Sequence, residues 1–170
     1  MSNGWEALLG ELTSKYNPKK SEHTAKGILE YACIYGIQDK QLYASHPKGW
    51  KLETYNFDCP QEDGSTKSVP VDEVVCAIAA SKGQRGGGNA GAGIRINKKK
   101  MMYIRPSPDA ANGAYLSCQG GGATIASTDK IVLVGIWNKE MSMSNKQMQN
   151  TGDCSLVVER MAKYLKSEGF

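Results

Sequence analysis

The sequence lacks the marks of a membrane-spanning or secreted protein. No apolar run in its 170 residues approaches the ~18 residues that a membrane-spanning helix requires. The segment Met1 to Glu6 has neither the basic nor the apolar stretch of a secretory leader. We therefore expect a cytoplasmic protein.

Potential metal ligands are also few. The five cysteines are an odd number, no two of them form a CxxC pair, and the only histidines are His23 and His46. This spacing disfavours both a structural zinc site and a disulfide framework. We expect no metal and no other cofactor, and we expect reduced thiols at Cys33, Cys59, Cys76, Cys118 and Cys154.

Catalytic signatures are missing as well. The chain has no GxSxG, HExxH or GxxxxGK[ST] pattern. Residues 86–91 (GGGNAG) formally match GxGxxG, but they are expected to follow a helix and precede a strand. A dinucleotide site needs the strand first and the helix N-terminus afterwards. We expect a surface loop and no enzyme; a small nucleotide-dependent enzyme built on this loop is the alternative.

The composition is typical of one globular domain, residues 1–170. Hydrophobic residues make up 40% of the chain and charged residues 22%. The formal net charge of +4 favours acidic partners but is far below that of a dedicated nucleic-acid binder. We expect a monomer that binds no nucleic acid.

Apolar periodicity predicts three helices. The first ends at Asn17-Pro18 and buries one stripe, Trp5, Leu8, Leu9 and Leu12. The second covers about 69–82, where Pro70 suits the first turn and Gly83 can close the helix. The third covers about 153–167 and buries Cys154, Val157, Val158, Met161 and Leu165.

Short runs rich in β-branched and aromatic residues predict strands between these helices. They cover 31–37, 42–44, 100–105, 113–118, 122–127 and 131–137. Residues 45–68 are rich in turn formers and are expected to be irregular, and residues 83–93 form a glycine-rich loop. Because the connections are too short for parallel crossovers, we expect an α+β domain on an antiparallel sheet.

Aromatic residues are concentrated at the two ends of the chain. Trp5 lies near one end, and Tyr164 and Phe170 lie near the other. If the terminal helices pack side by side, these rings can form an exposed patch for a polyproline II ligand. The alternative is ordinary core packing. The outward stripe of the last helix suits either a protein interface or a solvated face; it contains Ser155, Leu156, Glu159, Arg160 and Lys163.

Several segments, in chain order, resemble the profilin family. Residues 4–7 (GWEA) are similar to its N-terminal tryptophan helix, and residues 32–36 (ACIYG) to its first strand. The most specific segment is 152–165 (GDCSLVVERMAKYL), which is very similar to the CNMVVERLGDYL ending of many profilins. The resemblance implies a profilin-like central antiparallel sheet. The N- and C-terminal helices lie together on one face, with further helices on the other.

The resemblance also implies a groove for proline-rich segments. The family's groove positions fall on Trp5, Leu8, Tyr43, Tyr164, Leu165 and Phe170. Leu8 stands where the family usually has a tyrosine, so one wall of the groove lacks a ring. Each lost aromatic contact costs about 1 kcal/mol, so we expect an altered preference among proline ligands.

A face for monomeric actin is implied too. The family's contact positions fall on Lys100, Met102, Tyr103, Arg105, Asn150, Gly152, Ser155, Leu156, Glu159 and Arg160. Basic residues that the family often places after the strand at Tyr115 are absent from residues 117–120 (SCQG). Residues 139–151 are longer than usual and rich in methionine, which adapts to irregular partner surfaces.

The implied function is that of a cytoskeleton-associated protein that binds actin monomers and regulates filament assembly and nucleotide exchange. Its other implied partners are proline-rich assembly factors such as formins. Phosphoinositides are a further implied partner, at Lys98, Lys99, Lys100 and Arg105. The alternative is a trafficking or scaffold module of similar shape that binds neither actin nor polyproline.

Overall fold

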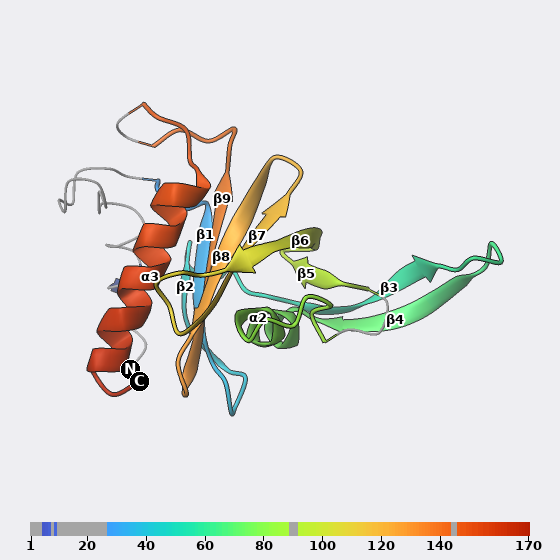
Figure 1. Cartoon of the computed structure of the whole chain (residues 1–170), viewed down its shortest axis with the longest axis horizontal. Coiled ribbons are helices and arrows are strands. Elements are labelled where there is room, and N and C mark those ends of the chain that lie inside the picture. The colour runs from blue at the N-terminus through green and yellow to red at the C-terminus, as the bar shows by residue number, and fades with distance from the viewer. Residues whose placement is uncertain (1–4, 8, 10–26, 89–91, 144–145) are drawn as a thin grey trace.

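A seven-stranded antiparallel sheet, in the order β2-β1-β9-β8-β7-β6-β5, forms the centre of the molecule (Figure 1). The computed structural model describes residues 5–7, 9, 27–88, 92–143 and 146–170. The strands of the sheet are β1 (Tyr31–Gly36), β2 (Leu42–His46), β5 (Ile94–Ile96), β6 (Lys99–Pro106), β7 (Asn112–Cys118), β8 (Gly121–Ser127) and β9 (Ile131–Asn138). The other elements are a hairpin of β3 (Thr54–Pro60) and β4 (Thr66–Asp72), and the helices α2 (Glu73–Ser81) and α3 (Thr151–Ser167).

Helices cover both faces of the sheet. α3 packs on β8 and β9, whereas α2 packs on the opposite face, beside the β3–β4 hairpin (Figure 1). Trp5 and Leu9 belong to the α3 core, so the two terminal segments share one face. The predicted α+β fold is therefore confirmed. Within the described residues, no helix is long and apolar enough to cross a bilayer.

α3 matches its prediction closely. Asn150 caps it, because the Asn150 side-chain oxygen accepts a hydrogen bond from the Asp153 backbone N–H at 2.9 Å. The predicted apolar stripe is buried in full, so the 3.6-residue period located the inner face of the helix correctly. The rest of the first predicted helix, including Leu8 and Leu12, lies outside the described residues.

The prediction of irregular structure over residues 45–68 is wrong. β3 and β4 pair from Thr54↔Asp72 to Pro60↔Thr66, and the hairpin extends away from the sheet (Figure 1). Half-buried residues alternate with exposed ones along β3, which is the two-residue period of a strand. The turn formers at 60–66 therefore mark the tip of a hairpin.

The second helix also begins later than predicted, at Glu73 rather than near residue 69. Asp72 caps it by accepting hydrogen bonds from the backbone N–H groups of Val74 and Val75, at 3.0 and 3.3 Å. Pro70 lies in β4, a strand with a free edge, where its missing N–H is tolerated. Proline at a helix start and proline at a strand edge look alike in sequence.

Glu73 joins the hairpin to the body of the molecule. Its carboxylate is fully buried. It accepts hydrogen bonds from the Glu53 N–H and the Tyr55 hydroxyl, both at 3.1 Å, and from the Lys98 N–H at 2.6 Å. Because these donors come from the start of the hairpin and from the β5–β6 turn, one side chain fixes three segments together.

We predict that Glu73→Ala lowers the free energy of unfolding by about 3 kcal/mol, because three part-buried donors lose their acceptor. Urea unfolding followed by circular dichroism measures the change. Glu62→Ala at the exposed hairpin tip is the matched control and should leave stability unchanged. Equal unfolding midpoints for wild type and Glu73→Ala would contradict the joining role of Glu73.

Candidate functional site

Aromatic rings from both chain ends meet at one site. The Trp5 and Phe170 ring centroids are 4.6 Å apart at an interplanar angle of 75°, and Trp5 lies 6.0 Å from the ring of Tyr43 on β2. Phe170 and Tyr164 remain 40% and 48% exposed. We call Trp5, Tyr43, Tyr164 and Phe170 the aromatic patch. The rings of Trp5, Tyr43 and Phe170 lie close together, and Tyr164 and Phe170 are open to a ligand.

Short contacts hold the aromatic patch in place. The Tyr43 hydroxyl donates to the Asp39 carboxylate at 3.1 Å, and Gly36 leaves room for it, because a Cβ there would collide with the Tyr43 hydroxyl. At the C-terminal end, Lys130 Nζ donates to the Gly169 carbonyl at 2.9 Å. The Phe170 N–H donates to the Leu165 carbonyl at 2.9 Å. The rings are therefore oriented before any ligand arrives.

The structure brings three of the six predicted groove residues into ring contact. Trp5, Tyr43 and Phe170 form the ring contacts above, and Tyr164 adds an exposed ring from α3. Leu165 is buried and supports the patch from the α3 core rather than lining its surface. Leu8 lies outside the described residues.

A second surface includes β6 and the earlier turns of α3. Lys100, Met102 and Arg105 are exposed on β6. Met101 points into the α2 core, so by strand alternation its neighbours Lys100 and Met102 point to the α3 face. Arg105 stacks on the Tyr115 ring, with its guanidinium carbon 4.9 Å from the centroid. β6 therefore presents basic and apolar groups beside α3.

α3 contributes to this surface unevenly. Gly152 and Arg160 are exposed, Leu156 is half-buried, and Asn150 caps the helix. Ser155 and Glu159, which were also predicted as contacts, are buried at 5% and 3% exposure. Both point inward in the free protein, so they position the surface instead of forming it. We call the exposed residues of this surface, Lys100, Met102, Arg105, Gly152, Leu156 and Arg160, the β6–α3 face.

Glu159 links α3 to the strand side of this surface. It accepts a hydrogen bond from the Ser107 hydroxyl at 2.8 Å and another from the Tyr115 hydroxyl. Burial, followed by the bond to Glu159, raises the pKa of Tyr115, so the phenol stays a protonated donor. Ser155 is held by its own bond to the Thr151 carbonyl. The helix side and the strand side of this surface are thus fixed relative to each other.

Tyr103 does not join the β6–α3 face. It pairs with Leu116, packs against the α2 core and carries the Arg85 guanidinium 5.1 Å from its ring centroid. Its side chain therefore points to the opposite side of the sheet from Met102. Ile104, by contrast, lies at a β-bulge and is 51% exposed, but the family resemblance did not indicate it. A bulge changes the alternation of side chains, which sequence spacing does not reveal.

The predicted phosphoinositide residues are only partly gathered. Lys98, Lys99 and Lys100 are exposed at the β5–β6 turn, where Lys98 Nζ lies 3.1 Å from the Glu53 carboxylate. Arg105 lies about 20 Å further along β6 at ~3.3 Å per residue. Lys48 and Lys51 are exposed on a loop that joins this turn through the Trp50 Nε1 bond to Asn97 Oδ1 at 3.3 Å. Lys48 and Lys51 are about 50 residues from the β5–β6 turn in the sequence, so the sequence alone does not indicate that they lie near it.

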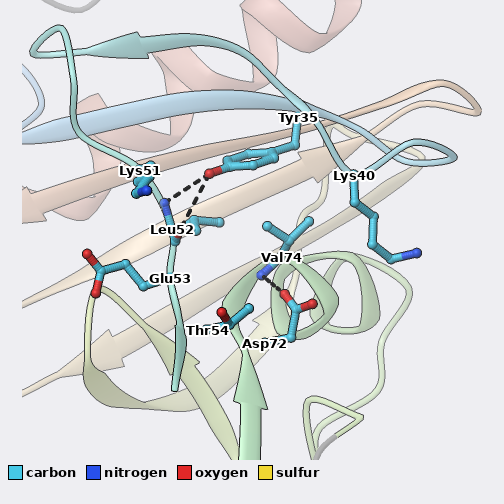
Figure 2. Close-up of a pocket in the computed structure, with 8 residues that line it drawn as sticks. All are labelled: Tyr35, Lys40, Lys51, Leu52, Glu53, Thr54, Asp72 and Val74. Carbon is cyan, nitrogen blue, oxygen red and sulfur yellow. Dashed lines mark hydrogen bonds between the residues drawn. The ribbon is translucent and has the colours of Figure 1, made fainter.

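A polar pocket of about 310 Å³ lies at the base of the β3–β4 hairpin (Figure 2). Tyr35, Leu52 and Val74 line it with Asp72 and Thr54, and none of the predicted site residues does. The Leu52 N–H donates a hydrogen bond to the Tyr35 hydroxyl at 3.1 Å. Burial raises the pKa of Tyr35 to about 12. The pocket carries no catalytic arrangement of side chains.

The five cysteines, all within the described residues, form no disulfide bond. Cys33, Cys76 and Cys154 are buried, and burial raises the pKa of Cys154 to about 12. A thiol protonated in this way is a poor nucleophile. Among the described residues, no cluster of cysteine, histidine and acidic side chains could hold a metal ion.

Comparison with known proteins identifies the family. A profilin family model matches residues 19–170. The profilin of Tetrahymena pyriformis is 29% identical over 147 residues, which cover 86% of this chain and 93% of that protein. The solved structure of Acanthamoeba castellanii profilin IA gives a TM-score of 0.58 at 18% identity, covering 98% of this chain and 99% of that one.

Rat profilin 2a gives a TM-score of 0.55 at 17% identity, covering 100% of this chain and 99% of that one. These structures confirm the profilin-like fold. Since the family model spans nearly the whole chain, the protein belongs to the profilin family, a family of actin-binding proteins without catalytic activity.

Proposed function

We propose that this protein binds monomeric actin through the β6–α3 face and proline-rich segments through the aromatic patch. The observation that carries the proposal is the position of α3. Tyr164 and the contact of Phe170 with Trp5 lie at the C-terminal end of the helix, whereas Leu156 and Arg160 lie in its earlier turns. Two ligands can therefore bind one rigid helix at different ends.

The aromatic patch suits a polyproline II helix. Such a ligand has no internal hydrogen bonds and loses little entropy on binding, so flat rings that stack on its prolines supply most of the affinity. Trp5, which contacts both Tyr43 and Phe170, is the central ring. Assembly factors with proline-rich stretches, such as formins, are ligands of this kind.

We predict that Trp5→Ala weakens binding of a proline decamer at least tenfold, because it removes the ring that the other two contact. Retention on a polyproline column and titration calorimetry measure the loss. Trp50→Phe is the matched control, since Trp50 stacks on Tyr31 with centroids 4.9 Å apart, far along the chain from the patch. Equal retention of wild type and Trp5→Ala would place the proline site away from Trp5, and no retention of either would favour the scaffold-module alternative.

The β6–α3 face suits a globular acidic partner. Lys100, Arg105 and Arg160 supply positive charge, and Met102 and Leu156 supply apolar area. Buried apolar contacts surrounded by charged groups are typical of specific protein interfaces. The hydrogen bonds of Glu159 keep the two walls of the face in register, so the face is preformed.

We predict that Arg160→Ala and Lys100→Glu each weaken the binding of monomeric actin about tenfold without altering the fold, because each removes charge from the face. Titration of latrunculin-bound actin, which stays monomeric, gives the affinities. Lys67→Ala on the β3–β4 hairpin is the control with the same loss of a surface cation. Unchanged affinity in both variants would move the actin site elsewhere on the molecule.

Capture of proline-rich segments would tether bound actin near a growing filament end and raise its local concentration. In this proposal the protein acts as a cytoplasmic, cytoskeleton-associated monomer that regulates filament assembly and nucleotide exchange on actin. The lysines of the β5–β6 turn would bind phosphoinositides. Lys48 and Lys51 lie near that turn in space, because the hydrogen bond from Trp50 to Asn97 joins their loop to it.

A further inference from the structure

Trp137 on β9 lies on the α3 face of the sheet but was not among the predicted contacts. It pairs with Gly122 on β8 and packs against the α3 core. A Cβ added at Gly122 would lie 3.0 Å from the indole Nε1, so the glycine leaves the space that the indole fills. The ring therefore lies flat against β8, and it is still partly exposed.

The indole N–H of Trp137 is buried without a hydrogen-bond partner among the described residues. Unpaired buried donors are uncommon, because the donor has given up its bond to water without gaining another. Among the described residues, packing alone holds the Trp137 side chain, in contrast to Trp50, whose Nε1 donates to Asn97.

Met102 continues the row that contains Trp137. Met102 pairs with Ser117, Ser117 with Gly122, and Gly122 with Trp137. Residues directly opposite each other on antiparallel strands point to the same face, so Met102 and Trp137 share the α3 face. Met102 is 68% exposed. This row therefore carries apolar groups, and residues 117–120 (SCQG) add no basic side chain.

Two more exposed methionines follow β9. Met141 and Met148 are 42% and 54% exposed. The Gln149 N–H donates to the Met141 carbonyl at 2.8 Å. The Gln149 side chain accepts from the Asn138 N–H at 2.9 Å and donates to the Gly27 carbonyl at 2.6 Å. The buried Gln149 thus fixes both methionines between β9 and the cap of α3.

We propose that Trp137, Met102, Met141 and Met148 form an apolar extension of the β6–α3 face, with monomeric actin as its occupant. This inference rests on the proposed function. The extension is continuous with that face, because Met102 lies beside Lys100 on β6 and Met148 lies beside the α3 cap Asn150. Methionines adapt to an apolar partner surface, and tryptophan is a common anchor of interfaces. At this end of the face these residues replace attraction by basic residues.

Titration of latrunculin-bound actin into two variants tests the proposal. Trp137→Phe and the double variant Met141→Gln with Met148→Gln should each weaken actin binding five- to tenfold, on the order expected for contacts near an interface centre. Binding of a proline decamer should not change in either. Leu42→Gln is the matched control, because Leu42 is an exposed apolar residue on β2, at the far edge of the sheet.

The outcomes separate this inference from the proposed function. If wild type does not bind actin, the proposed function fails and the inference fails with it. If Arg160→Ala weakens binding but both new variants match wild type, only the inference is overturned. If Trp137→Phe unfolds, the methionine variant decides alone. Self-association of wild type that the methionine variant abolishes would assign the extension to a second copy and overturn the actin occupant.

Discussion

The close approach of α3 to β9 at Gly135 is the packing constraint on which both candidate surfaces depend. A Cβ at Gly135 would lie 2.5 Å from a methyl of Val158 and 3.1 Å from Leu29. The Cys154 thiol donates to the Gly135 carbonyl at 3.5 Å. Any larger side chain at this position would push the helix away from the sheet. The helix would then lose its alignment with Tyr43 on one side and Tyr115 on the other.

This arrangement explains how a small domain can present two separate surfaces. The C-terminal end of α3 meets the rings of the aromatic patch. Its earlier turns meet β8 through Ser155, and they meet β7 and the residue after β6 through Glu159. Because the helix is stiff and buried along one stripe, a ligand at one end has little effect on the other end. The β3–β4 hairpin belongs to the opposite face and is held by Glu73.

Sequence patterns predicted the elements whose apolar period is undisturbed. α3, β6, β7, β8 and β9 were located within a few residues, because each buries a continuous stripe or a whole face. The β3–β4 hairpin was missed because it buries only alternate residues and contains Pro60 and Pro70. Proline and glycine at its tip were interpreted as loop signals, although they also occur at the ends of strands.

The candidate site could be predicted by position but not by orientation. Family resemblance placed Tyr103 with Met102, yet strand alternation sends their side chains to opposite faces. It also placed Ser155 and Glu159 on the surface, whereas their hydrogen bonds turn them inward. Trp137 carried no signal in the sequence, because its relevance comes from Gly122, a neighbour only across the sheet.

The central claim is that the two ends of α3 bind two ligands independently. The most direct measurement is the affinity for latrunculin-bound actin with and without a saturating proline decamer. The account predicts equal actin affinities and a ternary complex in sedimentation velocity. Mutual displacement of the two ligands would contradict it, because both would then occupy the same part of the helix.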